Sequence, residues 1–161
     1  MKKLLFILFL SALSTGSFGE ENNILQNGDF SKGSKKWHGD IRVTHETSSK
    51  KNKICIIKIK DESRLFYQYA KPKKKTKITL QFRVKRSADY AGKGYQIRFE
   101  KNGSYKIWDK KVPKKANQWV DIKIKISYKN YKKCKYVKLE VRTKPGVSGF
   151  LYFDDFKLVE K

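Results

Sequence analysis

The chain has 161 residues, of which 34% are charged, and 39 Lys and Arg against 15 Asp and Glu give a formal net charge of +24. After a short apolar run at the start, no apolar stretch is long enough to cross a bilayer, which argues against a membrane-spanning protein. Only six of the basic residues are Arg. Because phosphate and nucleic-acid sites favour the bidentate Arg side chain, this composition argues against nucleic acid as a partner.

The first 19 residues have the pattern of a secretory signal peptide. Lys2 and Lys3 precede the apolar run LLFILFL at 4–10, and Ser17 and Gly19 stand at the −3 and −1 positions of a cleavage site. We therefore predict that residues 1–19 are removed on export to the periplasm or the extracellular space. Residues 20–161 are then expected to form one domain. It would carry 37 basic and 15 acidic side chains, because the removed segment contains only the two lysines.

Most of the remaining chain alternates between apolar and polar residues, which predicts half-buried strands of an antiparallel protein. In chain order these segments are 53–60, 64–71, 77–85, 95–101, 121–127, 136–143 and 149–160. Asn102-Gly103 is the residue pair preferred in two-residue hairpin turns. The lysine-rich segments 71–77 and 111–118 read as loops, and the run SSKKNK at 48–53 as a solvated turn. Short strands separated by turns at this spacing predict an all-β fold, a two-sheet antiparallel sandwich.

The sequence contains two cysteines, Cys55 and Cys134, and in an exported chain a disulfide bond between them would persist. Cys55 shares the phase of Ile57 and Ile59 and is expected to face inward. Cys134 is out of phase with Val137 unless it lies in the loop before that strand. A disulfide bond and two free thiols both remain open, and the two histidines lack the spacing of a zinc site.

Motifs at the two ends of the mature chain carry a family resemblance. NGDFS and Trp37 open it, LYFDDFKL closes it, and LFYQYA, ITLQFRVK and QWVDIKIKI stand between them in that order. This series resembles the carbohydrate-binding modules of families four and nine and their xylan-binding relatives. The resemblance implies a galactose-binding-like jelly-roll sandwich with Trp37 in its core. It also implies a non-catalytic module that binds polysaccharide and usually accompanies glycoside hydrolase domains.

The resemblance further implies a structural calcium ion. In the relatives, a Glu after the Phe of the opening motif and an Asp of the closing strand help to hold it. Here Ser31 replaces that Glu, while Asp29, Asp154 and Asp155 remain as oxygen ligands of the kind that calcium prefers. The alternative is that Asp29 caps a turn and that Asp154 or Asp155 accepts backbone hydrogen bonds where the two ends meet.

In such folds the sugar lies on the outward face of the concave sheet. If Phe66 and Ala70 are buried, Tyr67 and Tyr69 point outward, about 7 Å apart along their strand. Trp108 is opposite in phase to its neighbours Tyr105 and Ile107 and is also expected outward. The polar partners of a sugar would come from neighbouring strands. The predicted carbohydrate-binding residues are Tyr67, Tyr69, Gln81, Arg83, Gln96, Arg98 and Trp108. A reversed phase in the LFYQYA strand remains the alternative.

We find no nucleophile triad, metal-ligand cluster or phosphate loop, and no pair of carboxylates at the spacing of a glycosidase, so we predict that the protein is not an enzyme. The leading hypothesis is an exported polysaccharide-binding protein whose charge favours acidic glycans. The alternative is a basic electrostatic or adhesive module that binds an anionic cell-surface polymer without a sugar groove. A lysine excess spread evenly over the surface would instead serve solubility alone.

Overall fold

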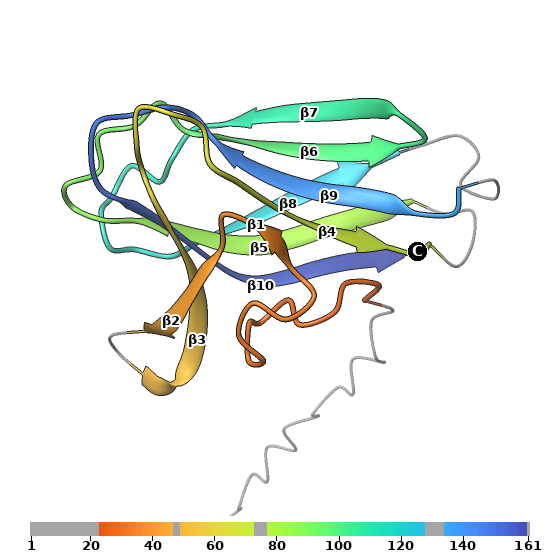
Figure 1. Ribbon diagram of the computed structural model, residues 1–161, viewed down its shortest axis with the longest axis horizontal. Helices are drawn as coiled ribbons and strands as arrows, with labels where there is room; N and C mark the ends of the chain where they lie inside the picture. The colour runs from red at the N-terminus through yellow and green to blue at the C-terminus, as the bar shows by residue number, and fades with distance from the viewer. Residues whose placement is uncertain (1–22, 47–48, 73–76, 128–133, 161) are drawn as a thin grey trace, which may run out of the picture.

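The computed structural model describes residues 23–46, 49–72, 77–127 and 134–160, so the expected signal peptide lies outside the described residues. The described chain forms two five-stranded antiparallel sheets that face each other (Figure 1). The strands are β1 (His38–Gly39), β2 (Arg42–Glu46), β3 (Ser49–Lys58), β4 (Leu65–Ala70), β5 (Ile78–Arg86), β6 (Tyr95–Lys101), β7 (Ser104–Lys110), β8 (Val120–Ile126), β9 (Val137–Thr143) and β10 (Phe150–Glu160). This confirms the predicted all-β sandwich. Within those ranges, no helix is of a length and apolarity to cross a membrane.

The strand order defines two surfaces. One sheet has the order β1-β4-β9-β6-β7 and is called here the tyrosine sheet; the other has the order β2-β3-β10-β5-β8 and is called the bulge sheet. Strands that are neighbours in a sheet are often distant in the sequence, as β4 and β9 are. Such crossovers between sheets are typical of jelly rolls. They also decide which predicted site residues share a face.

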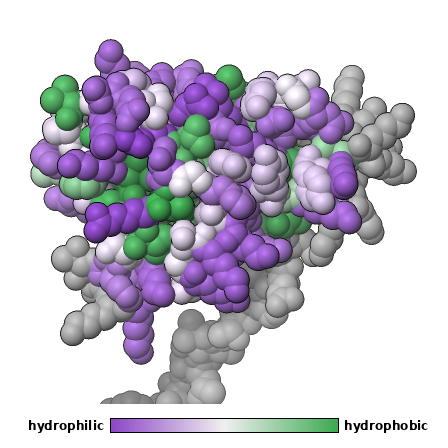
Figure 2. Space-filling view, in the orientation of Figure 1, coloured by the Kyte–Doolittle hydropathy of each residue, from purple (hydrophilic) through white to green (hydrophobic). Residues whose placement is uncertain are grey.

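The core lies between the sheets and is rich in aromatic rings. Trp37 is 5% exposed, and its ring centroid lies 5.4 Å from that of Phe30, 5.4 Å from that of Phe66 and 5.2 Å from that of Phe156. The indole N–H donates to the backbone oxygen of Asn27 at 3.0 Å. The expectation that Trp37 belongs to the core is therefore confirmed. The face of the molecule seen in Figure 2 is mostly hydrophilic, with smaller apolar groups among the polar side chains.

The two adjacent aspartates of β10 mark a β-bulge. The pairing of β10 with β5 shifts between Asp154 and Lys157, and Asp155 has a φ of 52°. The extra residue changes the side-chain parity of the strand. Phe153 and Phe156, three positions apart, are therefore both buried in the core, at 0% and 1% exposure.

The opening motif packs directly on this bulge. The Phe156 amide donates to the Gly28 oxygen at 2.9 Å, and a Cβ on Gly28 would lie 1.9 Å from the Phe156 oxygen, so only glycine permits the approach. Nearby, the Leu158 amide donates to Oδ1 of Asn23 at 2.9 Å. The NGDF turn and the Asp-Asp strand are thus two halves of one contact between the ends of the described chain.

Some local predictions are confirmed and others are wrong. Asn102 and Gly103, with φ values of 49° and 79°, form the expected tight turn between β6 and β7. Residues 49–53 of the run at 48–53 are not a turn, because they belong to β3, in which Ser49 and Lys53 pair with β2; Ser48 lies outside the described residues. Strands β1 and β2 were not predicted, because β1 has two residues and β2 is largely exposed without regular alternation.

Candidate functional site

Tyr67 and Tyr69 lie on the outer face of the tyrosine sheet. Phe66 and Ala70, which alternate with them on β4, are 1% and 3% exposed, so the predicted phase of this strand is confirmed. The two tyrosine rings meet edge to face with centroids 5.6 Å apart. His38 of β1 stacks on Tyr67 with centroids 5.3 Å apart. A short row of aromatic rings therefore covers the β1 and β4 side of this face.

A buried carboxylate lies at the middle of the same face. Glu140 of β9 pairs in register with Tyr67 on one side and with Arg98 of β6 on the other, and is 3% exposed. Its carboxylate oxygens lie 2.8 Å from Nζ of Lys138, 3.0 Å from Nη2 of Arg142 and 3.8 Å from Nη1 of Arg98. Burial raises the pKa of Glu140, but the neighbouring cations outweigh burial and hold the pKa below its usual range. The group therefore stays ionised.

Lys138 connects this carboxylate to the aromatic row. Its ammonium nitrogen lies 4.3 Å from the centroid of the Tyr67 ring, a cation–π contact. Burial lowers the pKa of Lys138, and the bond to Glu140 more than compensates, so the pKa lies above its usual value. Because β1 and β9 flank β4 on opposite sides, His38 and Lys138 hold Tyr67 between them. Tyr69 is 55% exposed and offers the freer ring.

Polar side chains continue the face across β6 and β7. Arg98 donates from Nε and Nη2 to Oε1 of Gln96 at 3.1 and 2.9 Å. The Gln96 amide in turn donates to Oδ1 of Asp109 at 3.1 Å, and Asp109 pairs with Lys144 at 2.6 Å. Gln96 and Arg98 therefore lie on the face that was predicted for them, held in defined orientations by hydrogen bonds.

Tyr105 of β7 completes the surface. It pairs in register with Glu100 of β6 and is 50% exposed. Its hydrogen bond to the Glu100 carboxylate raises the pKa of the Tyr105 hydroxyl. An exposed phenol ring thus stands at the β7 edge, across the sheet from Tyr69. We call the surface made by Tyr67, Tyr69, Gln96, Arg98, Tyr105, Lys138, Glu140 and Arg142 the tyrosine face.

Three predicted site residues do not reach the tyrosine face. Gln81 and Arg83 lie on β5, in the bulge sheet, and face the opposite side of the sandwich. Trp108 pairs in register with the fully buried Ile97 and packs against the core, so its outward orientation was predicted wrongly. The exposed large hydrophobic side chains of β7 are instead Tyr105 and Ile107, at 50% and 49%.

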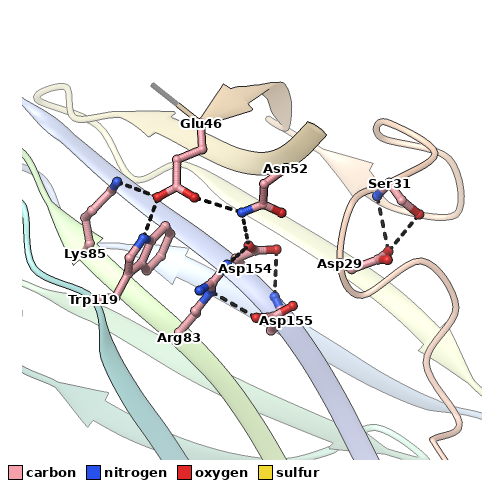
Figure 3. Close-up of polar contacts among 9 residues, drawn as sticks. All are labelled: Asp29, Ser31, Glu46, Asn52, Arg83, Lys85, Trp119, Asp154 and Asp155. Atoms are coloured by element: carbon pink, nitrogen blue, oxygen red, sulfur yellow. Dashed lines mark hydrogen bonds and ion pairs between the residues drawn. The ribbon is translucent and has the colours of Figure 1, made fainter. Parts of the chain in front are cut away.

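The three aspartates predicted to hold calcium do not meet as one group in the structure, and calcium binding itself stays a prediction. Asp154 is fully buried, and its carboxylate is bound by Nη2 of Arg83 at 2.5 Å and by Nδ2 of Asn52 at 3.2 Å (Figure 3). Asp29 accepts from the amide and hydroxyl of Ser31 at 3.2 and 3.0 Å, and it lines a small hollow together with Asp155. Among the residues that the structure describes, no three His, Cys, Asp or Glu side chains gather as a metal site. The turn-capping alternative for Asp29 fits these contacts.

Figure 3 shows the polar network that occupies the outer surface of the bulge sheet instead. Glu46 of β2 accepts from the Trp119 indole at 2.6 Å, from Lys85 at 3.1 Å and from Asn52 at 2.8 Å. Burial raises the pKa of Glu46, but these hydrogen bonds outweigh it and lower the pKa to about 2. Arg83 and Lys85 lie 4.7 and 4.6 Å from the Trp119 ring centroid. The network joins strands of one sheet, and Arg83, which belongs to it, also lines a surface hollow together with Gln81.

The cysteines are separate thiols. Cys55 points inward from β3 and is 0% exposed, as its phase predicted. Cys134 lies in the segment before β9, with its sulfur 2.8 Å from the Tyr136 backbone oxygen. The disulfide alternative is therefore wrong, and two free thiols describe the structure.

The residues that sequence reasoning missed are Lys138, Glu140, Arg142, Tyr105 and His38. The outward phase of the β9 residues was visible in the alternation of that segment. Their place beside the tyrosines was not, because it depends on β9 inserting between β4 and β6. Glu140 alternates with inward-facing residues and was therefore expected to be exposed; nothing in a single sequence predicts that its neighbours bury it.

No protein-family model and no curated protein matches the chain in sequence. Solved structures match its fold. A family 61 carbohydrate-binding module in complex with β-1,4-galactotriose has a TM-score of 0.67 at 18% identity, covering 88% of this chain and 100% of the module. A family 16 carbohydrate-binding module has a TM-score of 0.67 at 16% identity, covering 86% of this chain and 100% of its own.

The CBM22-1 xylan-binding domain of Paenibacillus barcinonensis Xyn10C is also similar, with a TM-score of 0.60 at 16% identity. It covers 88% of this chain and 97% of its own. At these identities the likeness concerns the fold. The resemblance to families four and nine in particular has no counterpart among these matches. The chain has the β-sandwich fold of carbohydrate-binding modules.

Proposed function

We propose that this protein is an exported, non-catalytic polysaccharide-binding protein and that the tyrosine face is its sugar site. The observation that carries the proposal is the combination of exposed phenol rings with a fixed, buried ion-pair network on one sheet. Sugar rings present C–H faces that stack on aromatic rings, and their hydroxyls need polar partners held in place. The tyrosine face offers both, on a fold shared with a galactotriose-bound module and a xylan-binding domain.

The three tyrosines have different roles in this proposal. Tyr69 and Tyr105, at 55% and 50% exposure, provide open rings for stacking. Tyr67 is held between His38 and Lys138 and supports Tyr69 by the edge-to-face contact at 5.6 Å. Stacking at Tyr69 then costs little side-chain entropy, because the neighbouring ring already restricts it.

Between the rings, the polar groups fit sugar hydroxyls. Arg98, Arg142 and Lys138 are held by Glu140, and each retains N–H groups beyond those that the carboxylate accepts. Hydrogen bonds to charged groups are stronger than those between neutral partners. The ordered network therefore gives orientation and selectivity to a ligand that the rings attract.

The same network argues for binding without catalysis. A glycosidase requires a carboxylic acid that donates a proton. Glu140 is the buried carboxylate of this face, and its three cationic neighbours keep its pKa low, so it does not retain a proton near neutral pH.

The proposal is tested by affinity electrophoresis or calorimetry of the protein without residues 1–19 against a panel of neutral polysaccharides, xylan and β-1,4-galactan among them. Tyr69→Ala should weaken binding by roughly fivefold, since an aromatic contact is worth about 1 kcal/mol. Tyr152→Ala, which removes a partly exposed tyrosine of the bulge sheet, is the matched control and should have no effect. Equal loss from both variants, or no retention of the native protein on any polysaccharide, contradicts the proposal. N-terminal sequencing of exported protein should begin at Glu20.

The electrostatic module remains the second candidate, and the net charge of +24 favours it. On the tyrosine face and among the residues bonded to it, however, charge is nearly balanced: the acidic residues are Glu140, Glu100 and Asp109, and the basic ones are Arg98, Lys138, Arg142 and Lys144. This balance favours a neutral sugar over the rings. An acidic ligand would need cations elsewhere on the molecule.

A further inference from the structure

A basic hollow lies at one end of the sandwich, between the β5–β6 and β7–β8 connections at the left of Figure 1. Its volume is about 440 Å³. The side chains and backbone that line it are Arg86, Tyr90, Gly92, Lys93, Gly94, Lys111, Val112, Pro113 and Lys114. Four of these residues are cationic, and none of the described residues that line it is acidic.

Arg86 forms a fixed base of the hollow. Its guanidinium donates to three backbone oxygens: to Pro113 at 2.8 Å, to Lys114 at 2.7 Å and to Ser87 at 3.2 Å. These bonds join the two connections and orient the group without neutralising its charge. The three oxygens that Arg86 contacts belong to neutral backbone groups, so it brings a net positive charge to the hollow, whereas Arg83 forms ion pairs with two aspartates.

The rest of the wall is also ordered by hydrogen bonds. The Gly94 amide donates to the Tyr90 hydroxyl oxygen at 3.1 Å. Burial raises the pKa of Tyr90, so the phenol stays neutral. Asp89 belongs to the same connection but does not line the hollow. Its charge adds to burial in raising the pKa of Tyr152.

Three lysines form the exposed rim. Lys93 precedes β6, while Lys111 and Lys114 follow β7, and all three are exposed. Lysines that converge on a small hollow above a fixed guanidinium raise the local concentration of anions. Strongly hydrated ammonium groups suit a carboxylate or sulfate that keeps part of its own hydration.

We propose that this hollow binds the anionic groups, carboxylate or sulfate, of an acidic polysaccharide. The proposal rests on the proposed polysaccharide-binding function and adds the class of ligand and a second contact point. Lys111 comes six residues after Tyr105 along β7 and its continuation, about 20 Å at the rise of an extended strand. A chain polymer of several sugar units is long enough to contact Tyr105 and the hollow together, and two linked contacts bind more tightly than either alone.

The test compares two triple variants of equal charge. One is Lys93→Gln/Lys111→Gln/Lys114→Gln. The control, Lys123→Gln/Lys125→Gln/Lys157→Gln, removes three exposed lysines from the outer surface of the bulge sheet. The probes are polygalacturonate against its methyl ester, for carboxylate, and dextran sulfate against dextran, for sulfate, each at low and high salt.

The rim variant should weaken binding to at least one acidic polymer by roughly tenfold at low salt, from three exposed charge contacts, while the control changes it much less. Binding to the neutral member of each pair should not change. Equal weakening by the two variants, or no binding of the native protein to either acidic polymer, overturns the proposal. Lysine-dependent retention on single-stranded DNA without retention on either acidic polymer also overturns it.

A comparison of Tyr69→Ala with the rim variant tests the hollow and the tyrosine face independently of each other. If Tyr69→Ala leaves every affinity intact while the rim variant lowers the acidic ones, the hollow is supported and the tyrosine face is wrong. If Tyr69→Ala lowers affinity and the rim variant does not, the tyrosine face is supported and the hollow is wrong.

Discussion

Lys138 contacts Tyr67 and Glu140 at once, with its ammonium nitrogen 4.3 Å from the ring centroid and 2.8 Å from Oε2 of the carboxylate. The Lys138 side chain therefore connects the aromatic row of the tyrosine face to its ion-pair network. A change at Lys138 should affect both the orientation of Tyr67 and the protonation of Glu140.

Lys138→Gln should weaken polysaccharide binding by about two- to fivefold, the lower range for a cation–π contact, because Lys138 orders the Tyr67 ring. The pKa of Glu140 should also rise, because its hydrogen-bonded cation is lost. Carboxylate NMR titration and calorimetry measure the two effects. Lys157→Gln on the bulge sheet is the control, and an unchanged Glu140 pKa in Lys138→Gln would contradict the link.

Acid stability should depend on Glu46. Its folded pKa of about 2 lies below the ordinary value of 4.5, so its ionised form stabilises the folded state above about pH 4.5. That contribution is lost as the pH falls from 4.5 through about 2. Burial raises the pKa of Asp154, so this residue changes the pH dependence of stability in the opposite direction. Its contribution is the same in the native protein and in Glu46→Gln. Glu46→Gln should therefore flatten the pH dependence of the unfolding free energy in this window, and an unchanged slope in denaturant titrations would refute it.

Much of the fold could be predicted from the sequence because the alternation of inward and outward side chains along a strand is a local property. Alternation located β4, β5, β6, β8, β9 and β10, and the phase of Tyr67 and Tyr69 followed from it. This alternation does not predict which of the two sheets a strand joins. Gln81 and Arg83 had the outward phase expected of them but belong to the other sheet.

Irregular features account for the remaining errors. The bulge at Asp155 inserts one residue, and both aspartates form ion pairs with Arg83, at 2.5 and 3.0 Å, which the sequence did not predict. The edge strand β7 pairs with β6 on one edge only, and most of its residues are exposed, so the exposure of Ile107 and the partial burial of Trp108 could not be predicted from hydrophobicity.

Trp37→Ala should destabilise the protein by about 3–5 kcal/mol, the range for removing a large buried aromatic side chain. The denaturant midpoint should fall with little change in slope. Trp119→Ala removes an indole of the same size from the bulge-sheet surface and should cost about 1–2 kcal/mol, mainly through its hydrogen bond to Glu46. Equal losses from the two variants would contradict the core assignment of Trp37.

Both cysteines should be reactive only after unfolding. Cys55 is fully buried, and burial raises the pKa of its thiol, while Cys134 is 8% exposed. A thiol reagent should therefore react slowly with native protein and with two thiols per chain in unreduced, denatured protein. Finding no reactive thiol after denaturation would indicate a disulfide bond and contradict the structure.

The location of the sugar site is the central claim, and backbone amide NMR of the protein without residues 1–19 tests it most directly. A neutral oligosaccharide cut from the polysaccharide that binds best is titrated into labelled protein. The account predicts that the largest shifts occur on β4, β9 and β6, around Tyr69, Glu140 and Arg98. Largest shifts on β5, β8 and β10, around Arg83 and Lys157, would place the sugar on the bulge sheet and contradict the account.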